Sequence, residues 1–117
     1  MKTKLAIAFL IASALPAAAA GPLPIVLGRG VNSCIDYTQG RLAALQVENS
    51  YFSWAQGYMS ALNITLSNQK LATRNVYHFS DDNMKKALQT YCTAHPADLF
   101  LVAVTKTFTE LPEIPVP

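Results

Sequence analysis

The sequence is poor in the residues and motifs from which active sites are usually built. Its 117 residues include two histidines and two cysteines, and only 14% of the chain is charged. It contains no G-x-S-x-G, no H-E-x-x-H and no glycine-rich phosphate loop. The two cysteines lack the C-x-x-C spacing, which argues against a redox or metal pair. We therefore predict no catalytic residue, no metal and no cofactor, and expect a protein that is not an enzyme.

The first twenty residues follow the three-part pattern of a secretory signal peptide. Lys2 and Lys4 give a basic start, residues 5–15 are apolar, and Ala18, Ala19 and Ala20 suit a signal peptidase. The apolar run is shorter than the roughly 20 residues of a spanning helix. The alanine-rich signal is typical of bacteria. The sequence thus predicts export to the periplasm and a soluble mature chain that starts at Gly21.

Cleavage of this signal would change the charge balance. The whole chain has nine basic and seven acidic side chains. Lys2 and Lys4 leave with the signal, so the mature protein is neutral. A neutral chain lacks the basic surface that attracts nucleic acid or anionic lipid. We therefore expect neither nucleic acid nor, after cleavage, a membrane as partner.

Cys34 and Cys92 are predicted to form one disulfide, the simplest pairing of two cysteines in an exported chain. The bridge would close a loop of roughly 58 residues, which the chain-entropy model values at about 4 kcal/mol. That is a large share of the roughly 5–15 kcal/mol that stabilises a typical domain.

Hydrophobic periodicity predicts an all-α fold, a small bundle of about four helices over residues 32–110. The first helix should start at Asn32 or Ser33 and run toward Gln46, although a break at Gly40 is left open. Ile35, Leu42 and Leu45 should form its apolar face. A second helix is expected from Asn49 or Ser50 to Asn63. Ser80 caps a third helix that reaches Cys92, and Pro96 starts a fourth that reaches Phe108, although a buried strand over 99–105 remains an alternative.

The segments outside the helices are expected to be extended or irregular. Residues 21–31 should form an arm whose apolar side chains lie over the core, and the proline-rich residues 111–117 a solvated tail. The connection 66–79 has no sustained period, although a short helical turn over 69–75 is allowed. Long connections are usually functional or mobile. Its Lys70, Arg74, Tyr77 and His78 are therefore the candidates for a partner-binding loop.

The second helix carries the only tryptophan. Trp54, Tyr58 and Leu62 follow Tyr51 at helical spacing, which is typical of a core stripe, although an exposed aromatic patch that anchors a partner is an alternative. Gly57 within this helix suggests the close approach of a neighbouring helix or ring. On the core interpretation, Trp54→Ala should cost roughly 3–5 kcal/mol.

Three short stretches carry a family resemblance. These are Cys34-Ile-Asp-Tyr37, Trp54-Ala-Gln-Gly57-Tyr58 running on to Asn63, and Tyr91-Cys92-Thr-Ala-His-Pro96 before an apolar helix. Together they resemble small periplasmic helical proteins, the HdeA/HdeB acid chaperones and the Tai-type immunity proteins of type VI secretion. The resemblance covers roughly residues 33–108. It departs at His95, where asparagine is more usual before the proline.

This resemblance implies a function and a set of residues. It implies a disulfide that joins the helices, with Tyr37, Trp54, Gly57, Tyr58, Asn63 and Pro96 in the core or at an interface. The W-x-x-G-Y element favours the immunity branch, whose members neutralise a secreted effector by binding it. The alternative is an acid-stress chaperone, which must loosen or dissociate at low pH; the low number of acidic residues weighs against it. The expected partner is thus an effector or a client protein, and a homodimer is left open.

Overall fold

The computed structural model describes residues 25–117, so the predicted signal peptide and the first residues of the predicted arm lie outside the described part. Four helices follow a short 3-10 turn, η1 (Gly28–Val31): α1 (Cys34–Ala43), α2 (Leu45–Asn68), α3 (Asp81–Ala94) and α4 (Phe100–Glu110). Cys34 and Cys92 form a disulfide between the start of α1 and the last turns of α3. The prediction of an all-α bundle of four helices with one disulfide is confirmed.

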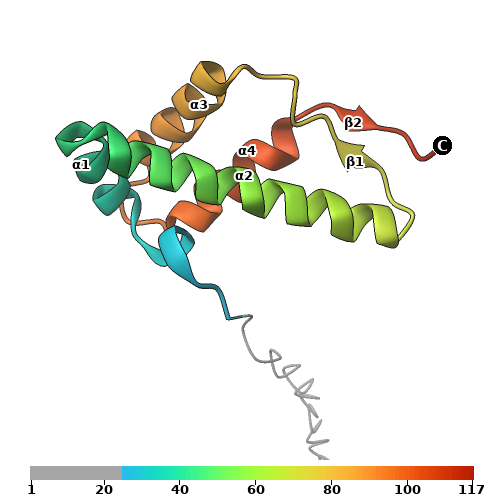
Figure 1. Ribbon diagram of the computed structural model, residues 1–117, viewed down its shortest axis with the longest axis horizontal. Helices are drawn as coiled ribbons and strands as arrows, with labels where there is room; N and C mark the ends of the chain where they lie inside the picture. The colour runs from blue at the N-terminus through green and yellow to red at the C-terminus, as the bar shows by residue number, and fades with distance from the viewer. Residues whose placement is uncertain (1–24) are drawn as a thin grey trace, which may run out of the picture.

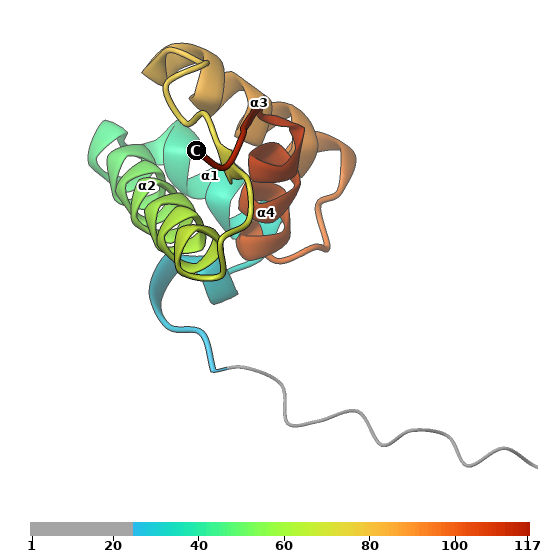
Figure 2. The same cartoon turned by 90° about the vertical axis from the view of Figure 1, so that its right-hand side faces the viewer.

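The long helix α2 crosses the whole molecule, and the other helices gather around its first half (Figure 1). Seen along α2, the helices α1, α3 and α4 lie on one side of it, and η1 closes the lower edge between α2 and α4 (Figure 2). Helix α3 packs against α1 and α4.

Two of the predicted helix starts are confirmed. Ser33 accepts a hydrogen bond from the Asp36 amide at 3.1 Å, and Asp36 Oδ2 accepts one from the Ser33 amide, a complete capping box. Ser80 caps α3 by accepting from the Asn83 amide. The side chains of the caps thus satisfy backbone N–H groups that have no partner inside the helix.

The predicted start of the fourth helix at Pro96 was wrong, since α4 begins at Phe100, although residues 100–105 are helical and not a strand. Pro96 lies in a turn whose carbonyl accepts a hydrogen bond from the Ile35 amide, and the Asp98 carbonyl accepts one from Cys34. The Asn32 carbonyl in turn accepts one from Phe100 at 2.8 Å. Residues 96–98 therefore cap α1 instead of opening α4.

The boundaries predicted for the second helix were also wrong. Helix α1 ends at Ala43 without a break at Gly40, Ala44 is extended, and α2 runs from Leu45 to Asn68. Ser50 lies inside the helix. It does not cap the helix, because its hydroxyl donates back to the Val47 carbonyl at 2.7 Å. No proline lies near Asn63, and the helix continues for more than a turn beyond it, to Asn68.

The core has an aromatic centre at the disulfide-bonded end. Tyr37, Tyr51 and Phe100 are almost fully buried, and their ring centroids lie 4.8–5.1 Å apart. Helix α1 turns Cys34 and Tyr37 inward, whereas Ile35 and Leu42 are exposed, as is Leu45. The predicted apolar face of the first helix was therefore wrong. Helix α1 is instead attached to the core by the Cys34–Cys92 disulfide and by the buried Tyr37 ring.

The expected solvated tail is instead partly paired. Residues Glu113–Ile114 (β2) form an antiparallel pair with Thr73–Arg74 (β1), with Thr73 opposite Ile114. The Leu111 side chain is buried, and the Pro112 carbonyl accepts a hydrogen bond from the Asn75 amide at 2.8 Å. The allowed helical turn over 69–75 is absent, because residues 73–74 pair with the tail.

Candidate functional site

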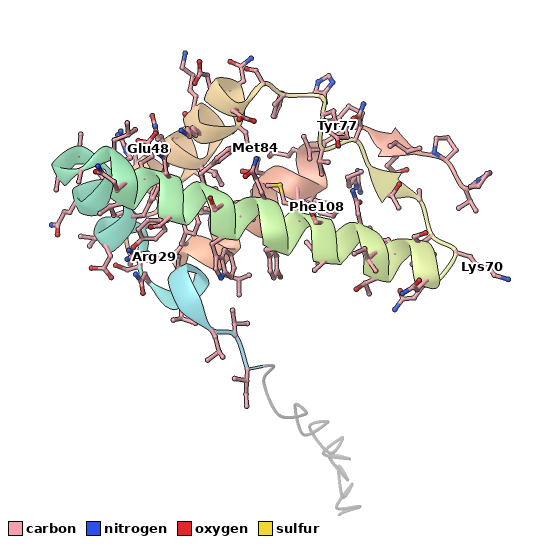
Figure 3. All side chains as sticks on the ribbon, in the orientation of Figure 1. Arg29, Glu48, Lys70, Tyr77, Met84 and Phe108 are labelled. Carbon is pink, nitrogen blue, oxygen red and sulfur yellow. A yellow bond between two sulfur atoms is a disulfide. The ribbon has the colours of Figure 1, made fainter. Side chains whose placement is uncertain are left out.

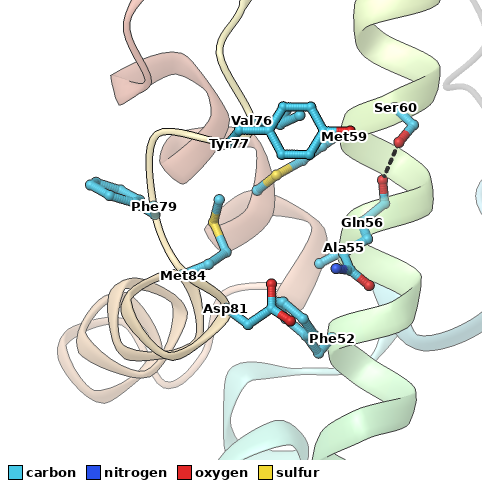
Figure 4. A pocket seen from close by; sticks show the side chains of 10 residues that line it. All are labelled: Phe52, Ala55, Gln56, Met59, Ser60, Val76, Tyr77, Phe79, Asp81 and Met84. Atoms are coloured by element: carbon cyan, nitrogen blue, oxygen red, sulfur yellow. Dashed lines mark hydrogen bonds between the residues drawn. The ribbon is translucent and has the colours of Figure 1, made fainter.

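A pocket of about 210 Å³ opens between α2, the start of α3 and the connection before α3 (Figure 4). Most of its lining is apolar, with an amide, a hydroxyl and a carboxylate among the side chains. The lining residues are Phe52, Ala55, Gln56, Met59, Ser60, Val76, Tyr77, Phe79, Asp81 and Met84. A concave apolar pocket with a few polar groups is the usual form of a binding site.

The deep part of the pocket belongs to the hydrophobic core. Phe52, Ala55 and Met59 come from one face of α2, and Met84 reaches toward them from α3. All four are buried, with Met59 and Met84 only 3% and 5% exposed. The helix period explains the set from α2, since residues 52, 55 and 59 are separated by three and four. The pocket is thus an extension of the core that remains open to solvent.

The rim is formed by Tyr77, whose side chain is 93% exposed. A turn at Asn75 holds it: Asn75 Oδ1 accepts from the Tyr77 amide at 3.1 Å, and the Asn75 carbonyl accepts from the His78 amide. Tyr77 and Met59 both line the pocket (Figure 4). The Tyr77 side chain is therefore free to contact a partner that enters the pocket.

The four candidates for a partner-binding loop do not lie together. Figure 3 shows Lys70 at the far end of α2, well away from Tyr77. Lys70 adopts φ 57° where α2 ends, and the amides of Lys70 and Leu71 donate to Ser67 and Leu66, a Schellman ending. His78 is exposed and its ring lies 5.0 Å from that of Phe79. Of the four, Tyr77 lines the pocket.

Arg74 has its contacts within the protein. Its guanidinium donates to the Leu111 carbonyl at 3.0 Å and pairs with Glu113 at 3.1 Å. Its backbone is held by Asn63, whose Oδ1 accepts from the Arg74 amide at 2.8 Å and whose Nδ2 donates to the Arg74 carbonyl at 2.9 Å. Asn63 therefore acts as a side-chain strand partner that fixes β1 on α2. It is a structural residue, as is Arg74.

Trp54 lies at the edge of the core and is only half-buried. Its indole N–H donates to the Leu27 carbonyl at 3.0 Å, and a Cβ at Gly30 would overlap its six-membered ring. The arm therefore covers Trp54 with glycine backbone, while Ile25 and Leu27 are exposed. The expectation that apolar side chains of the arm lie over the core was wrong for Ile25 and Leu27, whereas Val26 is partly buried and Leu23 lies outside the described residues. Trp54 packs against the core from this edge, so Trp54→Ala is still expected to cost roughly 3–5 kcal/mol.

The close approach predicted at Gly57 is absent. Gly57 is exposed, and a Cβ there would meet no atom within 4 Å. The Tyr58 ring stacks on Trp54 with centroids 5.1 Å apart. Of the two glycines inside the α-helices, the closely approached one is Gly40, where a Cβ would lie 2.7 Å from Val47 Cγ1, because α1 and α2 meet there.

A wider hollow between α3 and α4 is a surface furrow. It is bordered by the exposed residues Lys86, His95, Lys106 and Glu110, and Lys106 pairs with Glu110 at 3.0 Å. At its end, Tyr91 donates a hydrogen bond to Asp98 Oδ2 at 2.6 Å, and this bond raises the pKa of the Tyr91 hydroxyl. The His95 ring stacks on Tyr91. These contacts hold the 95–98 turn, and charged side chains border the hollow.

The pocket residues Phe52, Met84 and Asp81 were missed as site residues. The signal for Phe52 was present, since Phe52, Ala55 and Met59 form a second apolar stripe beside Tyr51, Trp54 and Tyr58. The sequence alone does not show which of the two adjoining apolar stripes lines a pocket between helices. Among residues 25–117, no three His, Cys, Asp or Glu side chains are grouped to hold a metal ion, and no helix is long and apolar enough to cross a bilayer.

Residues 25–117 form a small disulfide-bonded helical protein with an apolar pocket between α2 and α3. Comparison with known proteins adds no family to this description: no protein-family profile, curated protein or solved structure matches the chain. The likeness to periplasmic chaperones and immunity proteins rests on the three sequence stretches alone.

Proposed function

We propose that this protein is a small exported binding protein of the immunity type, which neutralises a secreted effector by covering part of its surface. The observation that carries the proposal is the apolar pocket with Tyr77 fully presented at its rim. Tyrosine, methionine and phenylalanine are enriched at the centres of protein interfaces, where a few buried aromatic anchors supply most of the affinity.

The chemistry of the pocket supports binding over catalysis. Its polar side chains are Gln56, Ser60 and Asp81, and Ser60 Oγ donates its hydrogen bond to the Gln56 carbonyl at 2.8 Å. No base within the pocket is bonded to that hydroxyl in a way that would activate it as a nucleophile. The paired cysteines support an exported location, since disulfides persist in oxidising compartments.

The proposal is tested with a secreted effector encoded beside this gene in the native host. The purified proteins are mixed, and the dissociation constant is measured by calorimetry for the natural protein, for Tyr77→Ala and for His78→Ala. His78 is the matched control, because it is the exposed neighbour that does not line the pocket. We expect Tyr77→Ala to weaken binding at least about tenfold, as for an interface anchor. His78→Ala should change it less than about twofold.

Two results would contradict the immunity proposal. One is that no neighbouring effector binds the natural protein below about 10 μM. The other is that an effector binds Tyr77→Ala as tightly as the natural protein, which would place the interface elsewhere. Thermal unfolding of each variant, followed by circular dichroism, shows whether the fold is intact.

The second candidate function is acid-activated chaperoning, and the placement of the carboxylates favours it. Glu48 is half-buried and pairs with Lys85 at 3.6 Å, Asp98 accepts from Tyr91, and Asp36 closes the α1 capping box. The Glu48–Lys85 pair joins α2 to α3, and a chaperone of this type needs such a contact between helices to loosen at low pH. Intrinsic fluorescence, size and protection of a client protein are measured from pH 7 to pH 2. An intact fold at pH 2 without client protection rules this function out.

A further inference from the structure

We propose that the pocket between α2 and α3 receives one large apolar side chain of the partner, next to a lysine or arginine of that partner. The inference rests on the proposed function in one respect, that the ligand is a protein segment. It goes further because it specifies which side chains the segment must carry.

The size of the pocket and its floor set the apolar part of this ligand. A volume of about 210 Å³ is close to that of one large side chain and too small for a helix. The floor is made by Phe52, Met59 and Met84 (Figure 4), and methionines adapt their three rotatable bonds to the shape of a guest. A leucine, methionine or phenylalanine side chain would complete this open extension of the core.

The walls are already in place before a partner arrives. Tyr77 is positioned by the Asn75 turn, and the Asn75 amide donates to the Pro112 carbonyl at 2.8 Å. The pairing of β1 with β2 and the double bond from Asn63 to Arg74 anchor the same segment. The backbone of the rim is thus anchored, which reduces the ordering cost of binding.

The charge of the lining selects the neighbouring residue of the ligand. Asp81 is the one ionisable carboxylate of the pocket, and no ion pair among residues 25–117 includes it. Lys85, one turn along α3 from Asp81, lies 5.1 Å from the centroid of the Phe52 ring but is already paired with Glu48. A cation on the ligand therefore meets an unpaired carboxylate, and an anion meets repulsion.

The same carboxylate disfavours a second copy of this chain as the occupant. In a two-fold dimer formed through this surface, the two patches would be identical, and each would bring its own Asp81 to the contact. Like charges facing each other oppose association. The observations therefore favour a different, basic partner segment.

The test uses the complete mature protein, with its two methionine methyl groups labelled with carbon-13. Met59 and Met84 are the only methionines of residues 25–117, and both line the pocket, so each of the two signals reports on it. The probes are N-acetyl dipeptide amides: Phe-Lys, Phe-Glu and Ala-Lys. We expect Phe-Lys to shift both methyl signals in a saturable way, and Ala-Lys to leave them in place.

The charge is tested with a matched pair of variants. Phe-Lys should bind about threefold more tightly than Phe-Glu, the effect of one exposed ion pair. Asp81→Asn should abolish this preference, whereas Asp82→Asn, which removes the adjacent exposed carboxylate that does not line the pocket, should preserve it. Both variants keep the Ser80 cap of α3.

Three outcomes would overturn the inference. The methyl signals do not move with Phe-Lys; or Phe-Lys and Phe-Glu bind equally; or the signals shift with protein concentration alone, which would identify a second copy as the occupant. Because no effector is needed, these results are independent of the effector titration. An effector that binds through Tyr77 while the dipeptides fail would leave the immunity proposal standing and remove this one.

Discussion

The two ends of the molecule are held together by different kinds of interaction. At the cross-linked end, residues 28–43 and 92–104, a disulfide, an aromatic centre and backbone caps join η1, α1, α3 and α4. At the open end, residues 63–80 and 111–114, polar side chains of Asn63 and Arg74 hold a two-residue strand pair against α2. The pocket borders the open end. The comparison suggests a rigid base that carries a more easily perturbed binding edge, in line with the uneven local stability of most folds.

The largest expected effect comes from breaking the cross-linked end. Replacing both cysteines by alanine should lower the free energy of unfolding by about 4 kcal/mol, since the bridge spans 58 residues of sequence. Urea unfolding followed by circular dichroism measures the loss. Adding dithiothreitol to the natural protein should reproduce it, and should leave the alanine variant unchanged. A loss below about 1 kcal/mol would show that this end does not depend on its cross-link.

An intermediate effect is expected at the open end. Asn63→Ala removes both bonds to the Arg74 backbone and should cost about 1–3 kcal/mol, because it leaves a donor and an acceptor unpaired. Hydrogen exchange should accelerate at the Arg74 and Asn75 amides while the amides of α4 stay protected. Asn68→Ala, which changes an exposed asparagine at the end of the same helix, is the control. Acceleration in α4 as well would mean that the two ends unfold as one unit.

A smaller effect should separate two glycines in adjoining helices. Gly57→Ala should raise the free energy of unfolding by about 1 kcal/mol, because Gly57 is an exposed helix position with open space around it. Gly40→Ala should lower it by about 1 kcal/mol, because the new methyl group would crowd Val47 where α1 meets α2. Thermal unfolding of both variants measures the difference. Two changes of the same sign would contradict the assignment of Gly40 to the tight contact.

The smallest effect at neutral pH is expected at Tyr37. Burial, and secondarily the charge of Glu48, raise the pKa of the Tyr37 hydroxyl to about 12. Since the unfolded value is about 10, the neutral hydroxyl stabilises the fold fully below pH 10, and this contribution is lost as the pH rises toward 12. Tyr37→Phe should weaken the dependence of stability on pH in this range. An unchanged dependence would show that Tyr37 ionises without unfolding the cross-linked end.

The cross-linked end could be predicted from the sequence in most respects. Cys34, Cys92 and Ser33 carry local signals, namely a pair of cysteines and a capping residue, and each was assigned correctly. The apolar face of α1 was assigned wrongly, because spacing shows that Ile35 and Leu42 share a face but does not show whether a neighbour covers it. Burial is set by the docking of helices, which local patterns do not contain.

The open end and the pocket could be predicted only in part. Tyr77 was selected because its connection is long and irregular, but Lys70 and Arg74 were selected on the same grounds, and the structure uses them for a helix ending and a strand anchor. The bond from Asn63 to Arg74 joins residues 11 positions apart through side chain and backbone, and no periodicity reports such a bond. The pocket itself arises from the space between two helices, which is a property of the assembled fold.

The shared caps near the disulfide have a consequence for the order of folding. The first turn of α1 is completed by the carbonyls of Pro96 and Asp98, and the first amide of α4 by the carbonyl of Asn32. Neither helix start is satisfied until these distant segments meet. In a reduced chain, this encounter must close a loop of some 60 residues, whereas an oxidised chain needs only the few residues between Cys92 and Pro96. Oxidation should therefore accelerate refolding on the order of tenfold, because the disulfide holds the two helix starts, of which that of α1 is partly capped by Ser33, close to the carbonyls that complete them.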